Sequence, residues 1–132
     1  MSVELAMLDE AARDLGITMT SASEGRHVED DGWEYDRWGI TLHRGHRSFT
    51  TQYRSGTGHG GKAPGVAEVL RAIESDANAG DRTFEEFCDE FGYDQDSRKA
   101  ERIWRACRGV GKRIRRFLGD DYRRVSEAAR EY

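Results

Sequence analysis

"WEYDRWGITLHRGHRSFTTQYRSG", residues 33–56, is the stretch that decides the fold of this 132-residue chain. Its core-type side chains recur at every second position, namely Trp38, Ile40 and Leu42 in the first half and Phe49, Thr51 and Tyr53 in the second. Alternation with a period of two predicts a strand with one buried face. The segment "HRGHR", centred on Gly45, separates the two runs and predicts a tight turn. Residues 33–56 are therefore expected to form an antiparallel hairpin.

Upstream of the hairpin, the sequence predicts one helix and one more strand. Ser2 can cap a helix that runs to about Asp14 and ends at Gly16. Residues 17–23, "ITMTSAS", are rich in threonine and serine and predict a strand. Residues 24–32, "EGRHVEDDG", read as a charged loop.

Downstream of the hairpin, the signals are helical. Pro64 is expected to be the first residue of a helix that Gly80 ends. Thr83 and Glu86 have the spacing of a capping box, and Gly92 is expected to stop the short helix that they begin.

A long helix follows, capped by Asp94 or Asp96, and Asp120 and Asp121 begin a last short helix. The expected buried stripe of the long helix is Ala100, Ile103, Trp104, Cys107, Val110, Gly111, Ile114 and Leu118. The sequence therefore predicts the α+β class, with a small antiparallel sheet of about three strands covered by an N-terminal helix and a C-terminal helical bundle.

The length fits one domain, 1–132. We divide it into a helix and sheet part, 1–63, with a glycine-rich loop at 55–63, and a helical part, 64–132. Charged residues make up 35% of the chain, but thirteen aromatic side chains indicate a folded core. No apolar run approaches a membrane span, the N-terminus is too acidic for a secretory signal, and Cys88 and Cys107 both fall on apolar stripes. These features favour the cytosol and no membrane partner.

Charge is divided into blocks along a chain whose net charge is −4. Residues 64–96 carry a net −8 and residues 97–124 a net +8. Opposite the apolar stripe of the long helix, 97–118, the expected basic face consists of Arg98, Arg102, Arg105, Arg108, Lys112, Arg113 and Arg116. This face could pair with the acids of the chain itself, contact a partner protein, or bind nucleic acid through the planar forks of its arginines.

The glycine-rich loop resembles a phosphate-binding loop in part. Gly56, Gly61 and Lys62 match G-x-x-x-x-G-K between a strand and a helix. Ala63 provides no hydroxyl for Mg²⁺, however, and Pro64 removes a backbone donor from the helix start. We therefore expect a mobile linker and no nucleotide cofactor.

Metal and catalytic sites find little support in the sequence. His43, His46 and His59 could meet at a metal, but nothing fixes them together. The acidic stretches starting at Asp76 and Asp94 lack the calcium-loop spacing. No pair of a nucleophile and a base is visible, so the sequence predicts a protein that is not an enzyme and needs no metal.

Three segments resemble a group of short, mostly uncharacterised proteins of tailed bacteriophages and prophages. They are "WGITLHRGHRSFTTQY", "PGVAEVLRAIESDA" and "RTFEEFCDEFGYDQDSRKAERIWRAC". The resemblance covers about residues 36–110 and is most specific from Thr83 to Glu101. It implies a mobile-element protein that acts in the cytoplasm of a bacterial host.

Small, charged phage proteins without catalytic residues often act by occupying a host protein. Our hypothesis is therefore a counter-defence protein, and more specifically an anti-CRISPR that inhibits by binding a CRISPR effector complex. Carboxylates on a rigid scaffold can compete for the cations that hold DNA. The candidate acids are Glu29, Asp30, Asp31 and Glu34 before the hairpin, and Glu85, Glu86, Asp89 and Glu90 on the short helix. The alternative is a nucleic-acid-binding accessory protein that uses the basic helix.

Overall fold

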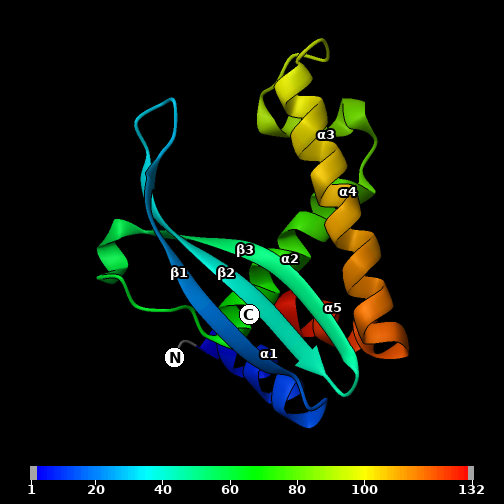
Figure 1. Ribbon diagram of the computed structural model, residues 1–132. Helices are drawn as coiled ribbons and strands as arrows, with labels where there is room; N and C mark the ends of the chain where they lie inside the picture. The colour runs from blue at the N-terminus through cyan, green and yellow to red at the C-terminus, as the bar shows by residue number, and fades with distance from the viewer. Residues whose placement is uncertain (1–2, 131–132) are drawn as a thin grey trace.

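The computed structural model describes the backbone of residues 3–130 and the side chains of 5–58 and 60–130, so the proposed cap at Ser2 lies outside the described residues. The elements are α1 (Val3–Asp14), β1 (Thr18–Val28), β2 (Glu34–Arg44), β3 (Arg47–Gly56), η1 (Thr57–His59), α2 (Val66–Asp81), α3 (Phe84–Phe91), α4 (Arg98–Leu118), η2 (Gly119–Asp121) and α5 (Tyr122–Arg130) (Figure 1). The α+β class and the order of helices and strands are as the sequence predicts.

The three strands form one antiparallel sheet in the order β1-β2-β3. Leu42 lies opposite Phe49, and Trp38 opposite Tyr53, so the predicted apolar positions pair on one face of the sheet. The β2–β3 connection is the two-residue turn Gly45–His46, and Gly45 has a φ of 59°, which glycine adopts without strain. The predicted hairpin is confirmed.

The strand β1 is longer than the sequence predicts. The expected charged loop at 24–32 is strand as far as Val28, and only Glu29–Trp33 form the turn. The register shifts between Ser23 and Arg26, which is a bulge, so regular alternation is lost where the strand continues. The extra length makes β1 and β2 an arm that extends beyond β3 (Figure 1).

The main core lies between the sheet and the helices. Its fully buried side chains come from both halves of the chain, and the largest are Leu8, Ile40, Leu42, Leu70, Ile114, Leu118, Val69 and Val125. A second, smaller cluster joins α3 to the first half of α4 and consists of Ala79, Phe87, Cys88, Ala100 and Cys107. Both cysteines are free and buried, as the sequence predicts.

Four expected helix boundaries are wrong or need refinement. Pro64 precedes α2, whose cap is Gly65, and Gly80 lies inside α2. The cap of α4 is Ser97, whose hydroxyl accepts a hydrogen bond from the Ala100 N–H, and it is neither Asp94 nor Asp96. Asp120 and Asp121 belong to η2, directly before α5. The capping box of Thr83 and Glu86 and the stop at Gly92 are confirmed.

Trp104 is less buried than the sequence predicts, and Phe91 at the end of α3 is exposed. Trp104 is only half-buried, with Nε1 donating to the Arg82 carbonyl at 3.0 Å, and Phe91 is 50% exposed. The apolar stripe of α4 is otherwise buried from Cys107 to Leu118. Along the described chain, no helix is both long and apolar enough to cross a membrane.

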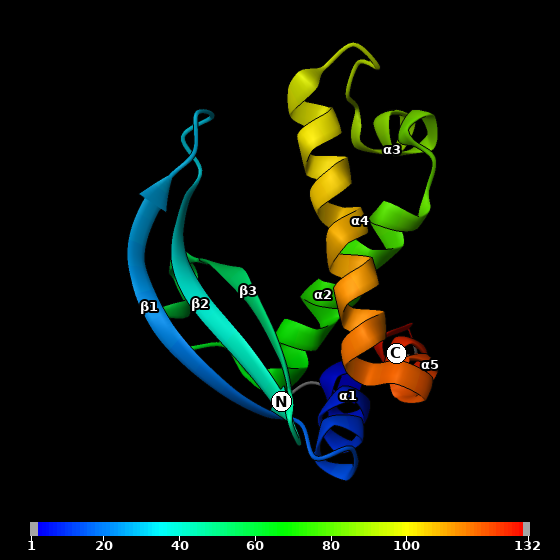
Figure 2. The ribbon, with the colours of Figure 1, turned by 45° about the vertical axis from the view of Figure 1, so that its right-hand side comes forward.

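The molecule has two arms that point to the same end. One is the β1–β2 arm, and the other is α3 with the first half of α4 (Figures 1 and 2). The main core joins their bases, with α1 and α5 at the opposite end. This arrangement places the hairpin tip across from the start of α4.

Candidate binding groove

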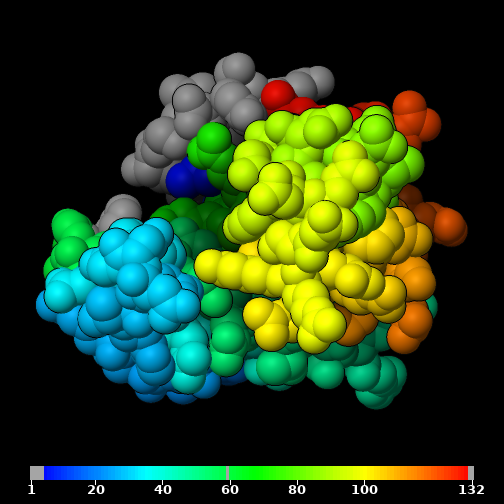
Figure 3. Space-filling view, turned by 90° about the horizontal axis from the view of Figure 1, so that it is seen from above, coloured from blue at the N-terminus to red at the C-terminus, as the bar shows by residue number. Residues whose placement is uncertain are grey.

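A groove of about 1560 Å³ separates the two arms (Figure 3). One wall is acidic and comes from the hairpin arm, with Glu24, Glu29, Asp30 and Asp31. The other wall is basic and comes from α4, with Lys99, Arg102 and Arg113. The consecutive residues 50–54 of β3 lie between these walls. The fold thus brings part of both predicted charged sets to one groove, from positions about seventy residues apart in the sequence.

The acidic wall is held in place by local contacts. Asp31 Oδ1 accepts a hydrogen bond from the Trp33 N–H at 2.9 Å, which tightens the turn. Glu29 pairs with Arg54 at 2.6 Å, and the Arg54 guanidinium lies over the Tyr35 ring. The Trp33 ring stacks on Tyr35 at 4.8 Å and remains 46% exposed. The tip therefore presents carboxylates next to a fixed, accessible indole.

The basic wall contains both free and engaged cations. Lys99 and Arg102 have no ion-pair partner among the described residues, and both are exposed. Arg113 donates to the Thr50 carbonyl oxygen at 2.7 Å and covers the Phe49 ring. Arg113 thereby anchors α4 to the edge of β3, while Lys99 and Arg102 remain available to a ligand.

The floor of the groove includes two titratable groups. The groove walls shield the Asp76 carboxyl and raise its pKa, although part of the side chain stays accessible to water. Burial raises the pKa of the Cys107 thiol to about 11, so the reactive thiolate is suppressed at neutral pH. The nearby Asp76 carboxylate also raises the pKa of Cys107, so this neighbour suppresses the thiolate and does not activate it.

The predicted acids of α3 lie outside the groove, on the other arm. Glu86 accepts the Thr83 backbone N–H in the capping box, which lowers the pKa of its carboxyl. Glu90 pairs with Arg82. Glu85 and Asp89, four residues apart, are exposed and share one helical face. Only these two of the four α3 acids are thus available for an external cation.

The predicted basic residues of α4 likewise include some that are engaged within the protein and some that are unpaired. Arg105 pairs with Glu101 on its own helix, and Arg108 donates to the Gly80 carbonyl and stacks over Trp104. Arg98, Arg102, Lys112 and Arg116 are exposed and have no ion-pair partner in the described part of the chain.

Pairing between the two charge blocks is limited. The residues described show one ion pair between 64–96 and 97–124, Asp81 with Arg115 at 2.7 Å. Within the described residues, the basic face of α4 thus pairs with acids of the chain itself only in part, through Arg105 and Glu101 of the same helix. The acids of the hairpin arm face the cations of α4 across the groove, whereas the acids of α3 lie on the same arm as α4 and outside the groove.

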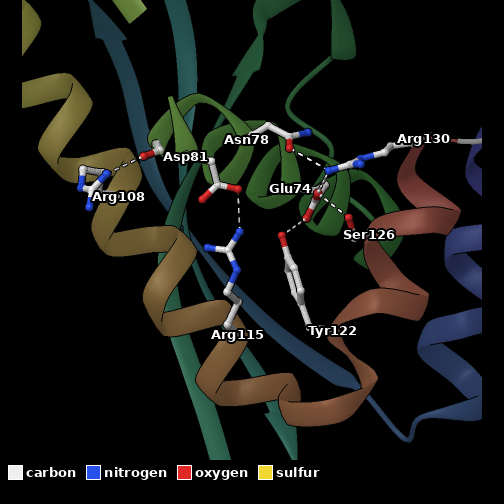
Figure 4. A network of polar contacts seen from close by, with 9 residues as sticks. Glu74, Asn78, Asp81, Arg108, Arg115, Tyr122, Ser126 and Arg130 are labelled. Atoms are coloured by element: carbon white, nitrogen blue, oxygen red, sulfur yellow. Dashed lines mark hydrogen bonds and ion pairs between the residues drawn. The ribbon is translucent and has the colours of Figure 1, made fainter. Parts of the chain in front are cut away.

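Sequence reasoning missed a buried polar network that joins α2 to α5 (Figure 4). Glu74 is only 3% exposed and accepts hydrogen bonds from Tyr122 and Ser126, each at 2.7 Å. Arg130 reaches both Glu74 and Asn78. Glu74 falls on the apolar side of α2, between Leu70 and Ala77, and this was the available signal. The network joins α2 to α5 and sets how these two helices pack.

Among the described side chains, no three histidine, cysteine or carboxylate groups gather to hold an ion. His43 contacts Thr20, His46 lies in the turn, and the side chain of His59 is outside the described residues.

No family model matches the chain, and neither a curated protein nor a solved structure is similar to it.

Proposed function

We propose that this protein is a phage or prophage counter-defence protein that inhibits a host defence complex by binding it, without catalysing a reaction. A CRISPR effector complex in the bacterial cytoplasm is the target that we favour. The resemblance to tailed-phage proteins supports a phage or prophage origin and a bacterial host. The charged arms support the mode of action.

One observation carries the proposal, which is that both arms present free carboxylates and an exposed aromatic ring. The hairpin tip has Asp30 three residues before the exposed Trp33, and α3 has Asp89 two residues before the 50%-exposed Phe91. The residues that contribute most to affinity at protein interfaces are enriched in tryptophan, tyrosine and arginine, and complementary charges set register and encounter rate. Such carboxylates can bind a protein surface whose arginine and lysine side chains normally hold phosphates.

The test is charge reversal of the free acids only. We would prepare Asp30→Lys with Glu34→Lys, and Glu85→Lys with Asp89→Lys, because these side chains have no ion pair or cap to lose. The matched control reverses Glu10 and Asp120, which are exposed and belong to α1 and η2, outside both arms. Circular dichroism would check that each variant is folded.

Binding to purified CRISPR effector complexes of the host would be measured by interferometry, and inhibition by plasmid interference. Each arm variant should weaken binding by about tenfold or more, which corresponds to about 1.4 kcal/mol, while the control binds normally. If both arm variants inhibit as well as the parent, or if no effector complex binds the parent, the proposal fails.

A second candidate function is favoured by the free cations of α4. Arg98, Arg102, Lys112 and Arg116 recur at intervals of four and ten residues and form one exposed stripe, on which Arg105, paired with Glu101, also lies. Such a stripe can follow a phosphate backbone. The acids of the hairpin arm oppose this binding on the groove side, so we place nucleic acid second.

A further inference from the structure

We propose that the groove binds an extended segment of a partner protein, which pairs with the outer edge of β3 as a fourth strand. The inference rests on the proposed function, in that the partner is a protein, and it specifies how the groove takes part. The argument starts from the register of the β2–β3 hairpin.

The register determines which backbone groups of β3 point outward. Arg44 and Arg47 flank the two-residue turn and form the first hydrogen-bonded pair of the ladder. Hydrogen-bonded and non-hydrogen-bonded pairs then alternate, so Thr50, Gln52 and Arg54 are not bonded to β2. Their N–H and C=O groups must point away from β2, toward α4.

A contact in the structure verifies this direction independently. The Thr50 carbonyl oxygen, which should point outward, accepts a hydrogen bond from Arg113 of α4 at 2.7 Å. β3 is an outer strand of the sheet. In the described part of the chain, the backbone N–H and C=O groups of Gln52 and Arg54 have no partner. The part of the β3 edge that is available to a fourth strand therefore begins beyond Thr50 and runs toward the tip of the β1–β2 arm.

The groove has the form that an added strand requires. Residues 50–54 line one side consecutively, and positions of α4 three or four residues apart, such as Arg102, Ala106 and Val110, line the other. Its volume of about 1560 Å³ exceeds the roughly 300–1,000 Å³ typical of small-molecule sites. A strand edge gives affinity through main-chain hydrogen bonds, and the walls give specificity through side chains.

The walls define the chemistry of the segment. Lys99 and Arg102 on α4 call for acidic side chains on the bound strand. Asp30 and Asp31 lie in the turn at the tip of the β1–β2 arm, so the end of the bound strand nearest that tip should carry a basic side chain. The expected ligand is therefore an extended, two-signed peptide segment, because a segment of one sign would be repelled by one of the walls.

A second folded copy of this chain does not suit this edge. Its own edge strand would bring a neighbouring strand and helices against α4, which already lies beside β3. The edge of β1 is also open, but none of its residues before Glu24 lines the groove. Only an isolated strand can enter between β3 and α4.

The test uses the full chain and a random octapeptide library displayed on phage. The strongest selected peptide would be synthesised, and amide hydrogen exchange would be followed by NMR with and without it. We expect the amides of Gln52 and Arg54 to exchange at least about tenfold more slowly when the peptide is bound. The outward amides of β1, Met19 and Ser21, should be unchanged. Protection of β1 alone, protection of neither edge, or no enriched peptide overturns the proposal.

A variant isolates the backbone contribution. Gln52→Pro removes one outward N–H, and an edge strand tolerates proline there because the ladder to β2 is not interrupted. It should weaken peptide binding by about tenfold, whereas Gln52→Ala should bind as the parent does. Equal affinity of all three proteins overturns strand addition.

The two proposals can fail separately. If an effector complex binds Gln52→Pro as tightly as the parent but loses the arm variants, strand addition is wrong and the proposed function stands. If a peptide protects Gln52 and Arg54 while no effector complex binds, the proposed function is wrong and strand addition stands.

Discussion

Gly80 of α2 lies directly against the backbone of Arg108 on α4. A Cβ atom added at Gly80 would be 2.5 Å from the Arg108 amide nitrogen and 2.6 Å from the Cys107 carbonyl carbon. The Arg108 side chain then turns back and donates to the Gly80 carbonyl oxygen at 3.2 Å. The two helices thus cross in backbone contact, and this crossing supports the arm that forms the basic wall of the groove.

Gly80→Ala should destabilise the protein, because the obstructing atoms are backbone and cannot rotate away. Overpacking of this kind costs about 1–3 kcal/mol. The control is Gly109→Ala, since nothing lies within 4 Å of a Cβ there and alanine is favoured inside a helix by about 0.5–1 kcal/mol. Urea denaturation should show opposite signs for the two variants. A neutral Gly80→Ala would mean that the helices can move apart at no cost.

Alkaline pH should weaken the junction between α2 and α5. Burial, together with the hydrogen bond to the Glu74 carboxylate, raises the pKa of Tyr122 from its ordinary value of 10.0 to about 12. A raised pKa means that the native state holds the proton more tightly. Its contribution is therefore complete below pH 10 and is lost as the pH rises toward 12.

Two pKa units at about 1.4 kcal/mol each would correspond to about 2.8 kcal/mol. Because the Tyr122 side chain is only partly buried and solvent screens its interactions, the expected loss is about 2 kcal/mol. It is measured as the difference between the parent and Tyr122→Phe in urea unfolding at several pH values. Tyr53 and Cys107, whose pKa values are also raised, titrate in both proteins and cancel in the difference. A difference that does not change between pH 8 and pH 12 contradicts the assignment.

Trp104→Ala should destabilise the protein by about 2 kcal/mol, less than the 3–5 kcal/mol of a fully buried tryptophan. The side chain is half-buried, packs against Phe84 at 5.4 Å and supports Arg108. Trp104→Phe keeps most of the ring packing but loses the Nε1 hydrogen bond to Arg82, and should cost about 1 kcal/mol. Thermal or urea unfolding of both variants tests this order, and equal losses would contradict it.

The sequence was most informative where one local pattern decides one local structure. Alternation from Trp38 to Tyr53 predicted the hairpin register, and Thr83 with Glu86 predicted the start of α3. These features depend on neighbours within a few residues. The role of Gly80 was not predictable in this way, because glycine near a helix end usually marks a stop, and only the packing against Arg108 explains it.

The groove could not be predicted from the sequence either, because its walls come from segments that are distant along the chain. The charges of Asp30 and Arg102 are visible in the sequence, but their positions on opposite walls depend on how α4 crosses α2 and on the length of β1. The extension of β1 past Ser23 was missed because the bulge breaks the alternation there. The carboxylate of Glu74 was also missed, since its partners Tyr122 and Ser126 are about fifty residues away.

Duplex DNA should bind the free protein weakly and with strong salt dependence. The cationic stripe of α4 can contact phosphates, but Asp30 and Asp31 repel them on the groove side. Reversing Arg98, Lys112 and Arg116, none of which lines the groove, should abolish DNA binding and leave binding of a groove peptide unchanged. Reversing Lys99 and Arg102 should weaken both.

Fluorescence anisotropy with a labelled duplex at 50 and 200 mM salt, beside the same measurement with the selected peptide, separates the two surfaces. For each cation that no longer neutralises a phosphate, the slope of log affinity against log salt should become shallower by about 0.9. Nanomolar DNA affinity at physiological salt that disappears when Arg98, Lys112 and Arg116 are reversed, together with no retention of an effector complex, would make nucleic acid the partner. The cationic stripe of α4 would then be the functional surface. Carboxylates on the hairpin arm that attract a cationic protein partner must also repel the phosphates of DNA, so nanomolar DNA binding would show that their influence is small.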